Sequence, residues 1–185
     1  MRSSPWLFLF FFIFCLRLTS TSITSPIAHE YRLRLFDIRN GKRLDIVYRR
    51  DDLYLPDALA QLDDYLRDRR TGDIRHYDPR VFDLLYDLET ALKRPGSEID
   101  VLCGYRSPRT NQLLRRRRDG VALHSLHMKG LAIDIRMPDV KTTALRDAAL
   151  ALHRGGVGFY PASSFVHVDV GRVRRWSWGT TNLLR

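Results

Sequence analysis

The chain has 185 residues and a formal net charge of +10, and 44% of its residues are hydrophobic. This length gives room for one ordinary domain with its own core plus a short extra segment, and the composition excludes an intrinsically disordered chain. The positive charge indicates an anionic partner, but it does not choose between nucleic acid, a membrane surface and an acidic polymer.

The first 25 residues have the layout of a secretory signal peptide. Arg2 precedes an apolar run, Trp6 to Leu16, that is too short to cross a bilayer comfortably, and small polar residues follow it. We therefore predict that residues 1–25 direct export to the periplasm or cell envelope, either as a cleaved signal peptide or as an uncleaved N-terminal anchor. If they are removed, Cys103 is the only cysteine left, so no intramolecular disulfide can form.

The next segment predicts a β-hairpin at residues 26–50. Apolar side chains alternate with charged ones from Tyr31 to Ile38, and Leu44 to Tyr48 follows as a second run. Asn40-Gly41 between the two runs is a strong hairpin signal. We expect an exposed two-stranded lead-in whose arginines face water, at the start of a single domain over residues 26–185.

Helical and strand patterns then follow each other through the rest of the chain. No internal repeat or low-complexity linker interrupts them, which indicates one compact α+β domain. The predicted helices cover residues 56–68, 78–93, 108–118 and 142–153. The predicted strands cover residues 98–104, 131–137, 155–160 and 165–170.

Two of these strands carry side chains suited to binding a metal ion. Alternation in residues 131–137 places Asp134 on the face opposite the apolar side chains. In residues 165–170 it places His167 and Asp169 on the face opposite three valines. Two neighbouring strands of this kind would present Asp134 and His167 to the same side of a sheet.

A further histidine, His127, lies in the turn before the first of these strands. Gly130 lets that turn bend tightly. His127, Asp134 and His167 together supply two imidazoles and a carboxylate, a set suited to zinc. Three protein ligands leave one tetrahedral position open for water, which distinguishes a catalytic zinc site from a structural one.

These residues also form a recognisable pattern. Ser-x-His-x-x-Gly-x-Ala-x-Asp, from Ser125 to Asp134, followed by His167 in a strand, resembles the zinc site of the M15 peptidases, which act on cell-wall peptides. Three further segments are similar to the subgroup typified by the K-type murein endopeptidase: Gly104-Tyr-Arg-Ser107, Gly155-Gly-Val-Gly158 and Phe165-Val-His-Val-Asp169. The likeness runs from about Tyr31 to Trp176. It implies a small antiparallel sheet flanked by helices.

The resemblance also implies the roles of individual residues. One zinc ion per chain would be held by His127, Asp134 and His167. Arg106 would contact the substrate or the oxyanion that develops on it, where a fixed positive charge stabilises negative charge. Zinc would lower the pKa of bound water to about 7 and polarise the scissile carbonyl.

One position departs from the family pattern. Many M15 enzymes have an acidic general base three residues before the last histidine ligand, and Ser164 occupies that position. Serine cannot take a proton from water at neutral pH. Asp169 is the nearest acidic substitute, and it acts either as the base or as a partner that orients a ligand.

Further substrate contacts are expected beside the metal ligands. We predict that Ser125, Gly156 and Tyr160 contact the substrate together with Arg106. Ser125 hydrogen-bonds within its turn rather than acting as a nucleophile. The glycines at 155–158 lack the lysine and helix of a phosphate loop, and we expect them to let an extended peptide add itself as an edge strand.

Two other features have less bearing on the reaction. Cys103 with His127 as base would suit a thiol peptidase, but burial in an apolar strand raises the pKa of a thiol and makes it inert. Arg115 to Arg118 is expected to be a solvated helix face. No aromatic residues interrupt it, which argues against nucleic acid. With export, an acidic glycan or anionic lipid of the cell envelope is the better partner.

The sequence thus supports one main hypothesis and two alternatives. The main one is an exported zinc metallopeptidase that hydrolyses peptide cross-links of peptidoglycan, with the resemblance implying links between two diaminopimelate residues. The first alternative is a non-catalytic peptidoglycan-binding module that keeps the fold, with Ser164 as the trace of a lost base. The second, a basic nucleic-acid-binding domain, is disfavoured by export.

Overall fold

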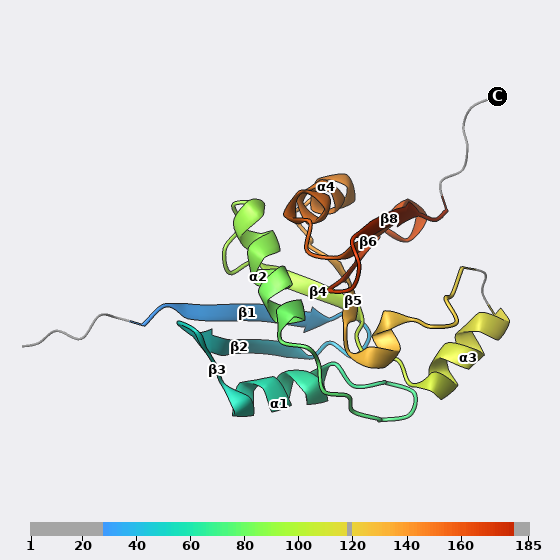
Figure 1. The fold of residues 1–185 in the computed structure, drawn as a ribbon, viewed down its shortest axis with the longest axis horizontal. Helices are drawn as coiled ribbons and strands as arrows, with labels where there is room; N and C mark the ends of the chain where they lie inside the picture. Colours follow the sequence, from blue (N-terminus) through green and yellow to red (C-terminus); the bar gives the residue numbers. More distant parts are fainter. Residues whose placement is uncertain (1–27, 118–119, 180–185) are drawn as a thin grey trace, which may run out of the picture.

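A mixed β-sheet with helices packed against it forms the part of the chain described by the computed structural model, residues 28–117 and 120–179 (Figure 1). The predicted signal segment at 1–25 lies outside these residues. Among the described helices, none is long and apolar enough to cross a membrane.

Eight strands make up the sheet, in the order β3-β2-β1-β4-β5-β7-β6-β8. The β1·β4 and β6·β8 pairs are parallel and the other pairs are antiparallel. The strands are β1 (Glu30–Asp37), β2 (Arg43–Arg50), β3 (Leu53–Tyr54), β4 (Glu98–Cys103), β5 (Ala132–Arg136), β6 (Gly156–Tyr160), β7 (Phe165–Asp169) and β8 (Arg174–Ser177).

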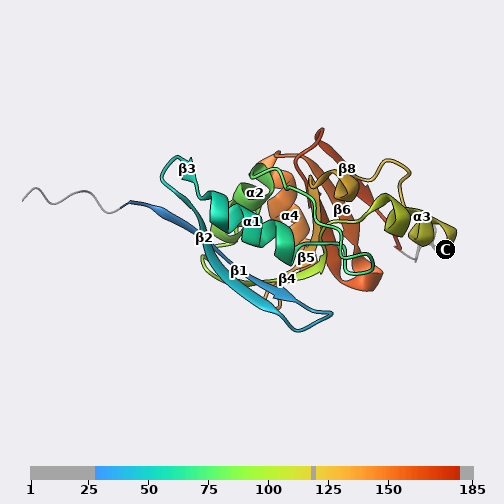
Figure 2. The same cartoon turned by 90° about the horizontal axis from the view of Figure 1, so that it is seen from below.

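Helices α1, α2 and α4 lie in a row along one face of the sheet, while α3 stands apart at its end (Figure 2). The core lies between this row and the sheet, and it is built from alternate strand residues such as Leu33, Ile99, Ile133 and Val168, all buried. The helices are α1 (Pro56–Tyr65), α2 (Arg80–Ala91), α3 (Pro108–Arg117) and α4 (Thr142–Leu152).

The N-terminal hairpin belongs to this sheet. β1 pairs in parallel with β4, so Leu33 and Leu35 are buried in the core, as are Ile46 and Tyr48 of β2. The expectation of an exposed lead-in is therefore wrong. Most arginines of the hairpin do face solvent, but Arg49 is largely covered and pairs with Asp83. The α+β class is confirmed, but the sheet is neither small nor purely antiparallel, because the hairpin adds to one side of it and β8 to the other.

Candidate metal centre

One row of side chains crosses the sheet on the face turned away from the core. Asp134 of β5 pairs directly with His167 of β7, and His167 also pairs with Gly158 of β6. Gly158 pairs in turn with Trp176 of β8. Because residues paired directly across strands project to the same face, this register brings Asp134 and His167 together, as the alternation predicted.

A β-bulge adds Cys103 to the same row. The register between β4 and β5 shifts after Val101, so that Val101 pairs with Ile135 while Cys103 pairs with Asp134. An uninterrupted strand would have placed Cys103 on the core face with Val101, and the extra residue of the bulge turns it to the other face. The prediction of a thiol buried in an apolar strand is therefore wrong: Cys103 is partly exposed and lines a cleft.

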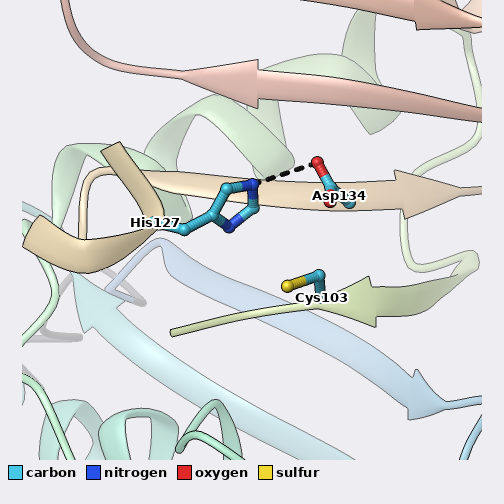
Figure 3. Close-up of side chains that lie close together, drawn as sticks. All are labelled: Cys103, His127 and Asp134. Carbon is cyan, nitrogen blue, oxygen red and sulfur yellow. Dashed lines mark hydrogen bonds and ion pairs between the residues drawn. The ribbon is translucent and has the colours of Figure 1, made fainter. Parts of the chain in front are cut away.

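His127 reaches the row from the 3-10 helix η1 (Leu126–Lys129), which precedes β5. Gly130 ends this helix with φ +67, and a Cβ atom there would lie 2.5 Å from the backbone oxygen of His76, so the turn needs glycine. The His127 ring is buried, and its Nδ1 atom lies 2.8 Å from the carbonyl oxygen of Gly104. That contact holds the ring with Nε2 facing Asp134 (Figure 3).

Three donor atoms converge at this point. His127 Nε2 lies 3.1 Å from Asp134 Oδ1 and 3.1 Å from His167 Nδ1, and the last two atoms are 2.9 Å apart. The outer ring nitrogens face oxygen acceptors, Gly104 O for His127 and Asp169 Oδ2 for His167. We assign the ring protons to these outer nitrogens.

With that assignment, both inner nitrogens turn lone pairs toward each other and toward a carboxylate oxygen. Such an arrangement is unfavourable unless a proton or a cation lies between the donors. Tetrahedral zinc with Zn–N distances of about 2.1 Å sets its ligand atoms about 3.4 Å apart, close to the separations observed. The donor set therefore fits a zinc ion.

The electrostatics of the cluster link metal binding to proton release. Burial lowers the pKa of His127, but Asp134 and Cys103 together outweigh burial and raise that pKa to about 10. Burial raises the pKa of Asp134, but the two histidines hold it far below its usual range. A divalent cation therefore competes with a proton at His127, and binding of the cation releases that proton.

Asp169 is fully buried behind His167. Its Oδ2 atom contacts His167 Nε2 at 3.2 Å, and its Oδ1 atom accepts hydrogen bonds from the backbone N–H groups of Gly156 and Gly171. Arg174 donates to both oxygens, at 3.2 and 2.8 Å. Burial raises the pKa of Asp169, but contacts with His167, Gly156 and Gly171 lower it to about 2. The carboxylate is thus surrounded by donors that fix it as an anion.

Arg106 lies beside the donor cluster. One of its terminal nitrogens is 3.9 Å from Asp134 Oδ2 and 3.5 Å from the sulfur of Cys103, and the other donates to Asn111 Oδ1 at 3.4 Å. The backbone turn that carries Arg106 is tied down on each side, by Ser107 N–H donating to Asp68 and by Tyr105 N–H donating to the carbonyl oxygen of Leu66. A fixed positive charge thus faces the cleft next to the donor atoms.

The cleft above the cluster has a volume of about 1060 Å³. His127, Asp134 and His167 line it together with Ser125, Tyr160 and Trp176, and six arginines and two aspartates are among its lining residues. Tyr160 stacks on Phe165, with ring centroids 4.4 Å apart, and its hydroxyl accepts a hydrogen bond from Trp176 Nε1. A cleft of this size and charge suits an anionic peptide.

The glycine-rich segment has a different structural reason from the one expected. β6 is paired on both sides, with β7 and β8, so no substrate can add to it as an edge strand. A Cβ atom at Gly158 would lie 2.5 Å from the indole of Trp176, and one at Gly156 would lie 2.4 Å from Asp169 Oδ2. Gly156 is not among the residues that line the cleft. The glycines make room for side chains of the protein itself.

Ser164 is exposed at the end of the 3-10 helix η2 (Pro161–Ser163) and faces a separate, smaller depression. It does not line the cleft that holds the donor atoms. The position at which many M15 enzymes carry an acidic base thus lies outside this cleft.

Sequence reasoning missed three side chains at the site, Cys103, Arg174 and Trp176. For Arg174 and Trp176 the sequence signal was weak, because the four residues that form β8, Arg-Arg-Trp-Ser, contain a single apolar side chain. For Cys103 there was none, because the bulge that redirects it does not show in the residue pattern.

Comparison with known proteins shows the family of the chain. A family model described as peptidoglycan L,D-endopeptidase MepK, of the M15 peptidases, matches residues 26–176. The chain is 42% identical to a probable peptidoglycan L,D-endopeptidase MepK of Haemophilus influenzae, over 76% of this chain and 75% of that protein. It is 38% identical to the peptidoglycan L,D-endopeptidase MepK of Escherichia coli K12, over 78% of this chain and 79% of that protein.

No solved structure matches the chain. The α+β fold and the cluster of two histidines and one aspartate are compatible with a metallopeptidase of the M15 class. The extent and identity of the matches place the chain more narrowly: it belongs to the M15 peptidase family of the peptidoglycan L,D-endopeptidase MepK.

Proposed function

We propose that the protein is an exported, zinc-dependent endopeptidase that hydrolyses peptide cross-links of peptidoglycan, including those between two diaminopimelate residues. The observation that carries this proposal is the convergence of His127, Asp134 and His167, whose donor atoms lie within 3.1 Å of one another at the floor of the cleft. Membership of a peptidase family whose named relatives are peptidoglycan L,D-endopeptidases supports the choice of substrate.

In this proposal, His127 Nε2, His167 Nδ1 and the Asp134 carboxylate hold one zinc ion. When bound, zinc polarises the scissile carbonyl and lowers the pKa of its water to about 7. Arg106 contributes a second positive charge from the protein itself. Its guanidinium is mostly withdrawn from solvent, so its field is screened less than that of a surface arginine.

Asp169 acts as the residue that orients His167. Its oxygens already accept hydrogen bonds from two backbone N–H groups and from Arg174, and Oδ2 also faces the outer nitrogen of His167. A carboxylate with this many donors and a pKa near 2 is poorly suited to take a proton from water. A carboxylate that accepts the outer N–H of a histidine ligand fixes its tautomer and orientation.

The charge of the cleft supports an anionic substrate. Cross-linked stem peptides carry free carboxylates, and six arginines line the cleft against two aspartates. Three of those arginines, Arg67, Arg69 and Arg174, form ion pairs with Asp64, Asp37 and Asp169, whereas Arg106 lies beside the donor cluster, 3.9 Å from Asp134. Substrate carboxylates entering the cleft would therefore meet a positive field.

The experiment is incubation of the purified protein with isolated sacculi, with and without a chelator, followed by mass spectrometry of the soluble fragments. We expect release of muropeptides that stops with the chelator and returns when zinc is restored. His127→Ala should lose zinc binding and release together, and an active, metal-free His127→Ala variant would refute the proposal. Retention on sacculi without any release would instead identify a peptidoglycan-binding module.

Export is part of the same proposal. Peptidoglycan lies outside the cytoplasmic membrane, and residues 1–25 have the layout of a signal peptide or N-terminal anchor. Fractionation of cells that express the full chain, with N-terminal sequencing of the product, tests this. We expect the protein in the envelope fraction; recovery from the cytoplasm with an intact N-terminus would contradict export.

A further inference from the structure

Cys103 lies beside the donor cluster but has no part in the proposed reaction. Its sulfur, a nitrogen of His127 and an oxygen of Asp134 all lie within 4.8 Å of one another (Figure 3). His167 Nδ1 is 2.9 Å from the same aspartate. Cys103 of β4 and His167 of β7 thus each lie close to the same two side chains, His127 of η1 and Asp134 of β5.

The backbone directs the Cys103 side chain to this point. The bulge in β4 pairs Cys103 with Asp134, and directly paired residues have Cβ atoms about 4.5–5.5 Å apart on the same face. Figure 3 shows the sulfur on the side of Cys103 that faces the His127 ring. The sulfur also lies 3.5 Å from a guanidinium nitrogen of Arg106, a positive charge that favours the thiolate.

The distances suit a fourth bond to the same ion. Zinc binds sulfur at about 2.3 Å and imidazole nitrogen at about 2.0–2.1 Å, which in a tetrahedron sets sulfur about 3.6 Å from the other ligand atoms. Starting from within 4.8 Å, the sulfur needs to move by at most about 1.2 Å to reach that distance from the ligand atoms of His127 and Asp134. Rotation of the Cys103 side chain, which is not packed into the core, can supply such a movement.

We propose that Cys103 is a fourth protein ligand of the metal ion, so that the resting site is closed by a thiolate at the position that water must occupy. The inference rests on the proposed metal site and adds a level of control to it. A site with four protein ligands has the make-up of a structural zinc site, and hydrolysis needs a position open to water. Activity then depends on displacement of Cys103 from the ion.

A second consequence concerns the choice of metal. Thiolate ligands favour zinc over magnesium, calcium and manganese, which prefer oxygen. A ligand set of one sulfur, two nitrogens and one oxygen therefore holds zinc more tightly than His127, Asp134 and His167 alone. Removal of the sulfur is expected to weaken zinc binding by about tenfold or more, since even partners outside the ligand shell contribute about 10–100-fold.

Cobalt substitution tests the bond directly. The full chain is loaded with Co²⁺ as wild type, as Cys103→Ser and as Cys15→Ser, which removes the other cysteine of the chain and serves as the matched control. We expect a thiolate-to-cobalt charge-transfer band in wild type and in Cys15→Ser, and its loss in Cys103→Ser. Competition with a chromophoric chelator should show zinc bound about tenfold more weakly by Cys103→Ser.

The cobalt spectra distinguish an error in the role of Cys103 from an error in the proposed metal site itself. Visible ligand-field bands without a charge-transfer band in wild type would show metal bound without sulfur, which overturns the role of Cys103 and leaves the three-ligand site standing. The absence of ligand-field bands from wild type would overturn both. X-ray absorption at the zinc edge of the unmodified protein needs no variant, and a first shell without sulfur would again refute the fourth ligand.

Turnover gives a third readout at saturating zinc. In wild type only a fraction of the sites is open to water, whereas in Cys103→Ser all of them are. Cys103→Ser is therefore expected to release muropeptides faster than wild type, by a factor of one divided by that fraction. A rate at or below that of wild type would contradict a closed resting site.

Discussion

The two halves of the sheet use the same outer face in different ways. On β1, β2 and β4, the face turned away from the core carries ion pairs such as Arg32 with Asp45 and Arg43 with Glu98, in which each arginine is more than half exposed. On β5, β7 and β6, the same face carries Asp134, His167 and Asp169, all buried. The alternation of side chains is the same in both halves, but the environment is not.

The difference comes from what covers each half. A cleft lies over the C-terminal half, and its walls include the α3 region and the segment at 120–127. Carboxylates that are covered from solvent need hydrogen-bond partners within the protein. Asp169 has such partners in the His167 imidazole, a backbone N–H group and Arg174. On the N-terminal half, Asp45 is exposed and hydrated, so it gains little from Arg32, and Asp100 of β4 is a buried exception. The comparison predicts that similar substitutions have large effects in one half and small effects in the other.

The largest expected effect is that of Asp169→Asn, which keeps the shape of the side chain but removes its charge. Loss of the acceptor that orients His167 should weaken zinc binding by about 10–100-fold, with a parallel loss of muropeptide release at limiting zinc. Zinc titration and mass spectrometry of digested sacculi measure the two effects. If Asp169 were the general base, turnover would fall while the affinity for zinc stayed the same.

Asp100→Asn is the matched control for this substitution. Asp100 is also buried and also accepts from an arginine, Arg136 Nε at 2.7 Å, but it lies on the outer face of β4 away from the donor cluster. Some loss of stability is expected and no change in zinc affinity. Equal effects of the two variants on zinc binding would contradict the orienting role of Asp169.

The next effect is that of Gly158→Ala, which tests how closely Trp176 must approach the row. The new Cβ would lie 2.5 Å from the indole ring, which stands 5.2 Å from the His167 ring. Overpacking of this kind costs about 1–3 kcal/mol of unfolding free energy. In a Trp176→Ala background the same substitution should cost close to nothing. Chemical denaturation of wild type, the two single variants and the double variant measures the coupling energy between the two positions. An additive result would show that the indole is not what requires glycine.

A smaller effect, dependent on pH, is expected at Asp68, which supports the turn that carries Arg106. Burial raises the pKa of Asp68, but hydrogen bonds from Ser107, Thr110 and Arg70 outweigh burial and lower it to about 2. The pKa of Asp68 is thus lower in the folded state than the unfolded value of about 3.9. The ionised carboxylate therefore stabilises the fold at pH values above about 3.9, and this stabilisation is lost as pH falls toward 2.

Asp68→Asn should therefore lower the free energy of unfolding by about 1–2 kcal/mol at neutral pH, since it leaves a buried N–H group without its charged acceptor. The difference in unfolding free energy between Asp68→Asn and wild type should shrink as pH falls from about 4 to about 2. Denaturant titrations across this range measure it. A gap that stays constant with pH would show that the carboxylate charge is not what supports the turn.

The ligand triad could be predicted from sequence because each of its members depends on a local signal. Alternation fixed the faces of Asp134 and His167, and Gly130 marked the turn that delivers His127. The remaining features depend on contacts between distant segments. Parallel pairing of β1 with β4 joins residues more than 60 positions apart, and nothing in the hairpin shows which strand it will meet.

The same limit applies within the site. Cys103 sits on an apolar strand whose regular alternation points it to the core, and one bulged residue reverses that direction. Gly158 is explained by an indole from another strand, Trp176 of β8, rather than by a substrate. A shift of one residue in strand pairing changes which side chains meet at both positions. That pairing is fixed by the packing of the whole sheet.

The smallest expected effect belongs to the exposed half, at Arg32→Ala. The guanidinium lies 2.6 Å from Asp45, with side chains 58% and 50% exposed, and an exposed pair contributes about 0–1 kcal/mol. Thermal denaturation should show little change, and the residual effect should shrink further in high salt because screening weakens exposed pairs. Zinc affinity should not change at all. If Arg32→Ala altered zinc binding, charge on the hairpin would be coupled to the donor row, and the two halves of the sheet could not be treated as independent.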